Sequence, residues 1–117
     1  IAQRLDDLDQ RLAKLAALES RALEAPSQSM EAMRLVAPLK LLGTELSQDV
    51  SELALDIAGP AALPRPVDNP AENRAHPYGG EGEHAMSSFL FGRAQSIYGG
   101  TNEVQKNILA KMMAAGL

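Results

Sequence analysis

Hydrophobic residues recur every three or four positions over the first 23 residues of the chain. These positions are Ile1, Leu5, Leu8, Leu12, Leu15, Ala22 and Leu23. The early spacings of 4, 3, 4 and 3 place them on one face of an α-helix, with charged residues on the other face. Pro26 disfavours helical geometry at Ala25, so the pattern predicts a first helix from Ile1 to about Leu23.

A second apolar stripe is longer and equally regular. Its members are Leu35, Leu39, Leu42, Leu46, Val50, Leu53 and Ile57, spaced 4, 3, 4, 4, 3 and 4. The stripe predicts a long amphipathic helix from about Ser27 to Ala58. Ser27 or Ser29 can cap its start, and the pair Gly59-Pro60 ends it.

Pro38 is the one residue in this stretch that opposes a helix. A proline inside a helix removes one hydrogen bond and clashes with the preceding turn. The segment before Pro38 could therefore be a separate turn. Because the apolar spacing continues through the proline, we favour a kink near Arg34–Pro38.

The rest of the chain predicts a loop and two shorter helices. Residues 60–83 hold five prolines and three glycines and show no periodicity, which is typical of a long loop. A third helix is expected from residue 83 or 84 to about 98, and a fourth from about 102 to 115. Amphipathic helices of this length bury their apolar stripes against one another. We therefore predict an all-α fold, an antiparallel four-helix bundle, formed by one helical domain over residues 1–117.

Composition and charge narrow the possible functions. The net charge is −4 without a basic patch, so nucleic-acid binding is not expected. The chain has no cysteine, which excludes a disulfide or a thiolate metal site. No apolar stretch approaches the roughly 20 residues that span a bilayer, and nothing resembles a signal peptide, so we expect a cytoplasmic protein. Since the chain begins with Ile1, not Met, we expect a processed chain or a fragment.

The two histidines do not form a convincing metal site. His76 and His84 are separated by eight positions, with Glu81 and Glu83 between them. A metal site needs ligands that converge on a fixed frame, whereas these residues lie in or beside the predicted loop. We therefore expect them at the surface. No set of residues suited to nucleophilic catalysis can be argued.

The stretch SIYGGTNEVQ, residues 96–105, has two interpretations. Gly99 or Gly100 can end the third helix, and Thr101 or Asn102 can cap the fourth. If Asn102 is the cap, Gln105 occupies the position that a capping box requires. Alternatively, a helix start preceded by two glycines exposes peptide N–H groups to a phosphate. The acidic residue that follows Asn102 weakens the second interpretation, and both remain open.

Two segments resemble the acyl-CoA dehydrogenase family. SIYGGTNEVQKNILAKMMAAGL, residues 96–117, resembles the C-terminal end of these flavoproteins. LKLLGTELSQDVSELALDIAGPAALP, residues 39–64, resembles a bacterial subgroup. The resemblance covers about residues 30–117. It implies a longer subunit with an N-terminal helical domain, a middle β-domain and a C-terminal helical bundle, of which this chain would be most.

The resemblance also implies a reaction and its partners. The family oxidises acyl-CoA thioesters to trans-2-enoyl-CoA: FAD takes a hydride from Cβ and a carboxylate removes a proton from Cα. Electrons then pass to an electron-transfer flavoprotein, and the subunit is expected to form a homodimer or homotetramer. The isolated chain is expected to be inactive. Acyl chain length and branching are not implied.

Five consecutive residues carry the resemblance at the site. Gly100 matches the glycine beside the substrate thioester, while Thr101, Asn102 and Glu103 match positions that touch FAD. Gly99 stands where many relatives have the catalytic Glu, so no catalytic residue is expected within this chain. Members with a small residue there place the Glu on an earlier helix, outside this sequence.

A second block, Asp56-Ile57-Ala58-Gly59-Pro60, matches a family segment whose backbone meets FAD from a neighbouring subunit. Asp56 replaces the family Gln, and Pro60 replaces a Gly. A carboxylate beside a pyrophosphate is unfavourable, so either the contact is lost or Asp56 turns elsewhere.

Other functions stay open at this stage. A redox-inactive partner subunit of a mixed oligomer would explain the missing base, and a related oxidase is a further possibility. A stand-alone helical interaction module is the third alternative, although it would not explain the sequence Gly99-Gly100-Thr101.

Overall fold

Four α-helices make up most of the part of the chain that the computed structural model describes, residues 1–63, 82 and 84–116. They are α1 (Ala2–Glu24), α2 (Met30–Ala58), α3 (Ala85–Gly92) and α4 (Asn102–Ala114). Two 3₁₀ turns, η1 (Gly59–Ala62) and η4 (Arg93–Ser96), follow α2 and α3. These residues contain no strand, and none of their helices is long and apolar enough to cross a membrane.

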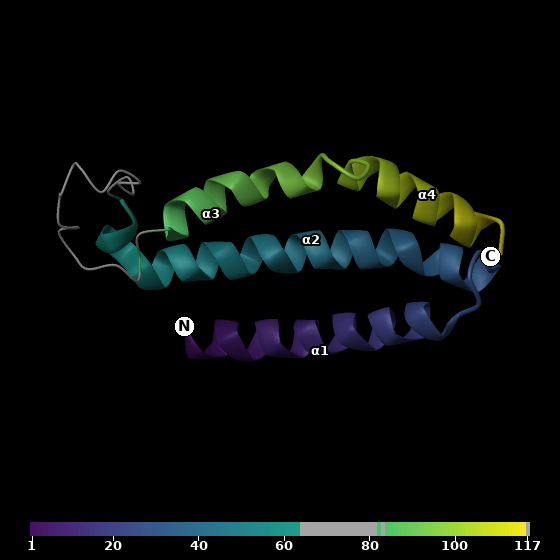
Figure 1. The fold of residues 1–117 in the computed structure, drawn as a ribbon, viewed down its shortest axis with the longest axis horizontal. Helices are drawn as coiled ribbons and strands as arrows, with labels where there is room; N and C mark the ends of the chain where they lie inside the picture. The colour runs from purple at the N-terminus through teal and green to yellow at the C-terminus, as the bar shows by residue number, and fades with distance from the viewer. Residues whose placement is uncertain (64–81, 83, 117) are drawn as a thin grey trace.

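The helices form three antiparallel rows with α2 in the middle (Figure 1). Ion pairs Arg4–Asp56 and Arg11–Asp49 show that α1 runs against α2. On the other side of α2, the segments α3, η4 and α4 follow one another end to end (Figure 1). The prediction of an all-α fold with four helices is confirmed. Because α3 and α4 share one row, the antiparallel arrangement has three rows of helices.

Most predicted helix boundaries agree with the structure. Ser29 caps α2, since its hydroxyl accepts a hydrogen bond of 3.1 Å from the Ala32 amide. α2 is continuous through Pro38. The predicted third helix is wrong in its second half, because α3 ends at Gly92 and the chain continues as the tighter turn η4. Most of the predicted loop 60–83 lies outside the described residues.

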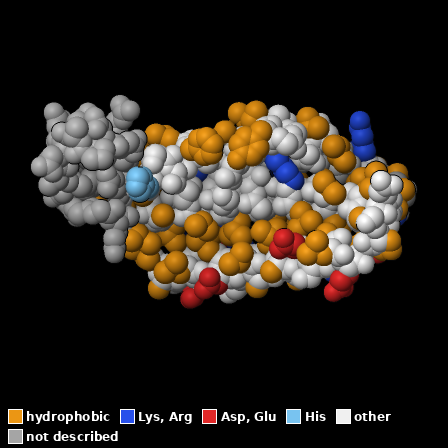
Figure 2. Space-filling model, viewed as in Figure 1, with side chains coloured by type: hydrophobic (Ala, Val, Ile, Leu, Met, Phe, Trp, Pro, Cys, Tyr) orange, Lys and Arg blue, Asp and Glu red, His pale blue; other side chains and the backbone are white. Residues whose placement is uncertain are grey.

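The core lies almost entirely along α2. The buried apolar residues are Leu35, Ala37, Leu41, Leu46, Leu53 and Ala62. Leu46 is 6% exposed and Leu53 3%, as their place on the stripe predicts, whereas Leu42 and Val50 are 42% and 49% exposed. The stripe is wider than the surface that α1 covers. Figure 2 shows one face of the molecule, on which hydrophobic side chains gather with few charged groups between them.

One edge of the seam between α1 and α2 is polar. Arg11 donates to Asp49 over 2.7 Å and also lies 3.6 Å from Asp7, which precedes it by four residues on α1. The hydrogen bond from Arg11 to Asp49 raises the pKa of the guanidinium. A hollow of about 330 Å³ at this edge is lined by Gln3, Arg4, Asp7, Leu8, Arg11 and Asp49. The two arginines that line it, Arg4 and Arg11, form ion pairs with Asp56 and Asp49 of α2. The side chains around this hollow therefore connect the two helices.

Candidate functional site

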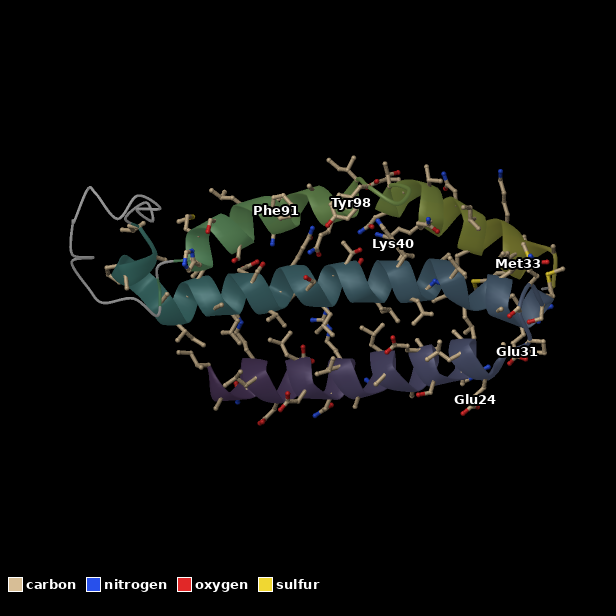
Figure 3. The ribbon with its side chains drawn as sticks, viewed as in Figure 1. Glu24, Glu31, Met33, Lys40, Phe91 and Tyr98 are labelled. Atoms are coloured by element: carbon tan, nitrogen blue, oxygen red, sulfur yellow. The ribbon has the colours of Figure 1, made fainter. Side chains whose placement is uncertain are left out.

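The two glycines of the α3–α4 junction lie opposite the middle of α2, and Figure 3 shows Tyr98 just before them. Gly99 has φ +68° and Gly100 φ +86°, and both are exposed. These angles belong to the left-handed region, which glycine adopts without steric cost. The glycines therefore stop one helical segment and allow the next to begin, as the sequence predicts.

The start of α4 is fixed by two side chains of its own. The Thr101 hydroxyl accepts a hydrogen bond of 3.2 Å from the Val104 amide, so Thr101 is the cap, not Asn102. The side-chain amide of Gln105 donates to the carbonyl of Gly99 over 3.2 Å. This amide lies so close to Gly100 that an added Cβ would be 2.7 Å from its nitrogen.

α2 presents a polar ridge to the junction. We use this name for Lys40, Thr44, Gln48 and Ser51, which are spaced 4, 4 and 3 residues apart and so share one helix face. Thr44 is buried, and Gln48 donates to the carbonyl of Gly92 over 3.2 Å. The ridge is polar because the break between α3 and α4 leaves main-chain groups without partners inside a helix.

Arg93 braces the junction on its α3 side. Its guanidinium donates to the carbonyl of Gln48 over 3.3 Å and lies 4.4 Å from the centre of the Phe89 ring. Ser96 donates to the carbonyl of Arg93, which closes η4. These contacts hold the segment that leads into the two glycines against α2.

Lys40 braces the junction on its α4 side. Its ammonium group donates to Oδ1 of Asn102 over 2.6 Å, and Figure 3 shows the side chain of Lys40 crossing from α2 to the beginning of α4. Asn102 is 9% exposed and is the one buried residue among those of α4. The first residue of this helix is thus both buried and hydrogen-bonded to α2.

The arrangement suits an acceptor-rich ligand. The exposed turn carries no side chain at two positions, and the helix behind it presents peptide N–H groups and the positive end of its dipole. The hydroxyl of Thr101 accepts from Val104 and keeps its own proton to donate. Glu103 is exposed in the first turn and reduces the positive potential. Nothing at Gly99 can act as a base.

The second predicted segment lies elsewhere. Asp56 is paired with Arg4 of α1, so its carboxylate turns towards the seam between α1 and α2. Gly59 ends α2 with φ +51°. Asp56 lies 16 residues beyond Lys40 along α2, which at 1.5 Å per residue is roughly 24 Å. The structure therefore does not bring residues 56–59 together with residues 99–103.

Sequence reasoning missed Lys40, Gln48 and Arg93, which hold the junction, and it gave Gln105 a different role. The first two had a detectable signal, because polar residues recur at four-residue intervals on the face of α2 opposite α1. Of the candidates near the predicted loop, His84 is exposed just before α3. His76, Glu81 and Glu83 lie outside the described residues.

Comparison with known proteins identifies similar sequences. The family model described as acyl-CoA dehydrogenase, C-terminal domain, matches residues 1–114. The chain is 33% identical over 97 residues to acyl-CoA dehydrogenase IpdE1 of Mycobacterium tuberculosis, which covers 83% of this chain and 20% of that protein. It is 38% identical over 72 residues to the protein of the same name in Mycolicibacterium smegmatis, covering 62% of the chain and 15% of that protein. No solved structure matches significantly. The chain spans at most about a fifth of the length of these relatives.

Proposed function

Because the chain belongs to the acyl-CoA dehydrogenase family, we propose that it forms the C-terminal helical part of an FAD-dependent acyl-CoA dehydrogenase. The complete subunit would convert an acyl-CoA thioester to the trans-2-enoyl-CoA, and electrons would leave to an electron-transfer flavoprotein. Bound FAD would supply the hydride acceptor. The contribution of this chain is to bind and orient, since the residue at the family's base position is Gly99.

The observation that carries the proposal is the geometry of the junction between α3 and α4. An exposed turn without side chains allows close approach to its backbone, which fits the thioester beside Gly100. The buried Asn102 and the cap Thr101 stand at the helix start, where the proposed flavin contacts of residues 101–103 need hydrogen-bond donors. Since both flanks of the turn are hydrogen-bonded to α2, the donors keep one arrangement before the ligand arrives.

The segment 56–59 fits a role towards a different flavin. The segment and the junction lie roughly 24 Å apart along α2, too far to contact the same part of one flavin. This distance supports contact of residues 56–59 with the flavin of a neighbouring subunit in a homodimer or homotetramer. The pairing of Asp56 with Arg4 turns its charge away from a pyrophosphate. The ion pair therefore reduces the repulsion that a free carboxylate would cause beside a pyrophosphate.

One observation favours a second candidate, a redox-inactive partner subunit. Gly99 offers no carboxylate, so proton removal from Cα would depend on an acidic residue outside this chain. A subunit without that residue could still bind acyl-CoA and complete an oligomer.

The test is to express the complete subunit and to measure its flavin content by absorbance. Acyl-CoAs of different length and branching are then added without oxygen, and flavin reduction is followed. Bleaching of the flavin by an acyl-CoA supports the proposal. Bound FAD that no acyl-CoA reduces would favour the inactive partner, and a subunit that binds no FAD would contradict the proposed function.

The isolated chain gives a complementary expectation. Its proposed contacts cover only one side of the cofactor, so we expect no tight binding. Titration of the 117-residue chain with FAD, followed by flavin fluorescence, should show no sub-micromolar affinity. Such an affinity would mean that the chain holds a complete flavin site.

A further inference from the structure

We propose that Lys40 is a positioning residue, which fixes the orientation of the Asn102 side-chain amide so that its NH₂ group faces an oxygen acceptor of the flavin nucleotide. The identity of this ligand rests on the function proposed above. The orientation itself follows from the contact between Lys40 and Asn102.

Hydrogen-bond chemistry allows only one orientation of the amide. A lysine ammonium group is a donor without acceptor capacity, whereas an asparagine amide has one acceptor oxygen and one donor nitrogen. At 2.6 Å from Nζ of Lys40, the atom of Asn102 must be its oxygen. A flipped amide would set two donors against each other in a largely buried position. The nitrogen of Asn102 therefore points away from Lys40.

Bracing of the junction does not by itself require a cation at position 40. A cation near a helix N-terminus is disfavoured by the helix dipole, and Lys40 reaches the first residue of α4. An apolar side chain at this point of α2 would avoid that penalty. What an apolar residue cannot do is distinguish the oxygen of Asn102 from its nitrogen, and this is the function that we infer.

Three substitutions in the complete, FAD-containing subunit separate the orientation of the amide from the stability of the fold. Asn102→Asp keeps an oxygen for Lys40 and strengthens the pair, but it removes the NH₂ donor and adds a negative charge. We expect its thermal midpoint to equal or exceed that of wild type, while the dissociation constant for FAD rises by about tenfold or more. Lys40→Met frees the amide and should also weaken FAD binding, whereas Lys40→Arg, which still donates, should restore most of the affinity.

Lys106→Met is the matched control. It removes one positive charge from α4, where the ammonium group of Lys106 lies 4.0 Å from Glu45 at the surface. Its FAD affinity should equal that of wild type. Equal losses in Lys106→Met and Lys40→Met would show a general charge effect and overturn the inference.

The remaining outcomes are also distinct. If Asn102→Asp binds FAD as tightly as wild type, the orientation of the amide is irrelevant and the inference fails, although the proposed function stands. If the wild-type subunit binds no FAD, the proposed function fails and the inference falls with it. Should Lys40→Met not fold, Asn102→Asp still decides, because it retains the contact with Lys40.

Discussion

Substitution of Gly100 by Ala tests the geometry of the candidate site most directly. At φ +86° an L-residue costs about 1–2 kcal/mol. The new Cβ would lie 2.7 Å from Nε2 of Gln105, so that flexible side chain must move and give up its bond to Gly99. A hydrogen bond of this kind contributes about 0.5–1.5 kcal/mol. Alanine also makes the unfolded chain less flexible, which offsets roughly 0.4–1 kcal/mol, so the net loss is about 0.5–3 kcal/mol.

Gly99→Ala is the matched control for this prediction. Its φ of +68° carries a similar backbone cost, but a Cβ at Gly99 meets no described atom within 4 Å. We expect Gly99→Ala to cost less by the contribution of the Gln105 hydrogen bond. The free energies of unfolding come from urea titration with linear extrapolation. The two alanine variants are compared in the wild-type and Gln105→Ala backgrounds, which forms a double-mutant cycle.

The cycle has a defined refutation. In the Gln105→Ala background, Gly100→Ala should cost no more than Gly99→Ala, because the contact that distinguishes the two positions is gone. If the difference persists there, Gln105 does not cover Gly100. If Gly100→Ala costs nothing in either background, the left-handed turn itself is wrong.

Three further predictions follow from burial and charge. Leu46→Ala should lose about 2–5 kcal/mol in denaturant titration, whereas the half-exposed Leu42→Ala should lose clearly less; equal losses would contradict the assigned core. Arg4→Ala should cost well under 1 kcal/mol and less still at high salt, because its ion pair is half exposed; a loss above 2 kcal/mol would show a structural role. In the complete subunit, Gly99→Glu adds a carboxylate beside the proposed base. Like-charge repulsion raises the pKa of one of the two, so turnover should fall at neutral pH and its profile shift to higher pH. Activity gained only in Gly99→Glu would instead indicate the redox-inactive partner.

Much of the secondary structure was predictable because it depends on local spacing. The period of apolar residues predicts α1 and α2 closely, and the glycine pair followed by Thr101 predicts the start of α4. A helix period and a helix stop are properties of neighbouring residues, so one sequence is enough to read them. The family resemblance likewise depends on the motif alone.

The change from α3 to η4 depended on tertiary contacts. Local preference would continue the helix to about residue 98, but the chain tightens after Gly92, whose carbonyl accepts from Gln48, 44 residues away. The partial exposure of Leu42 has a similar origin, since α1 alone is too narrow to cover the whole stripe. Spacing predicts which face is apolar, but not how much of it a neighbour covers.

Some polar side chains have two possible roles by sequence, and tertiary contacts decide between them. By sequence, either Thr101 or Asn102 could cap α4. In the structure Thr101 is the cap, and the side-chain oxygen of Asn102 accepts a hydrogen bond from Lys40 of α2. By sequence, Asp56 could face a ligand or a neighbouring helix. In the structure its carboxylate forms an ion pair with Arg4, which is 52 residues away. The sequence by itself determined where the helices run and which residues could serve the site. Only the tertiary structure decided which partner each polar group took, because those partners come from distant parts of the chain.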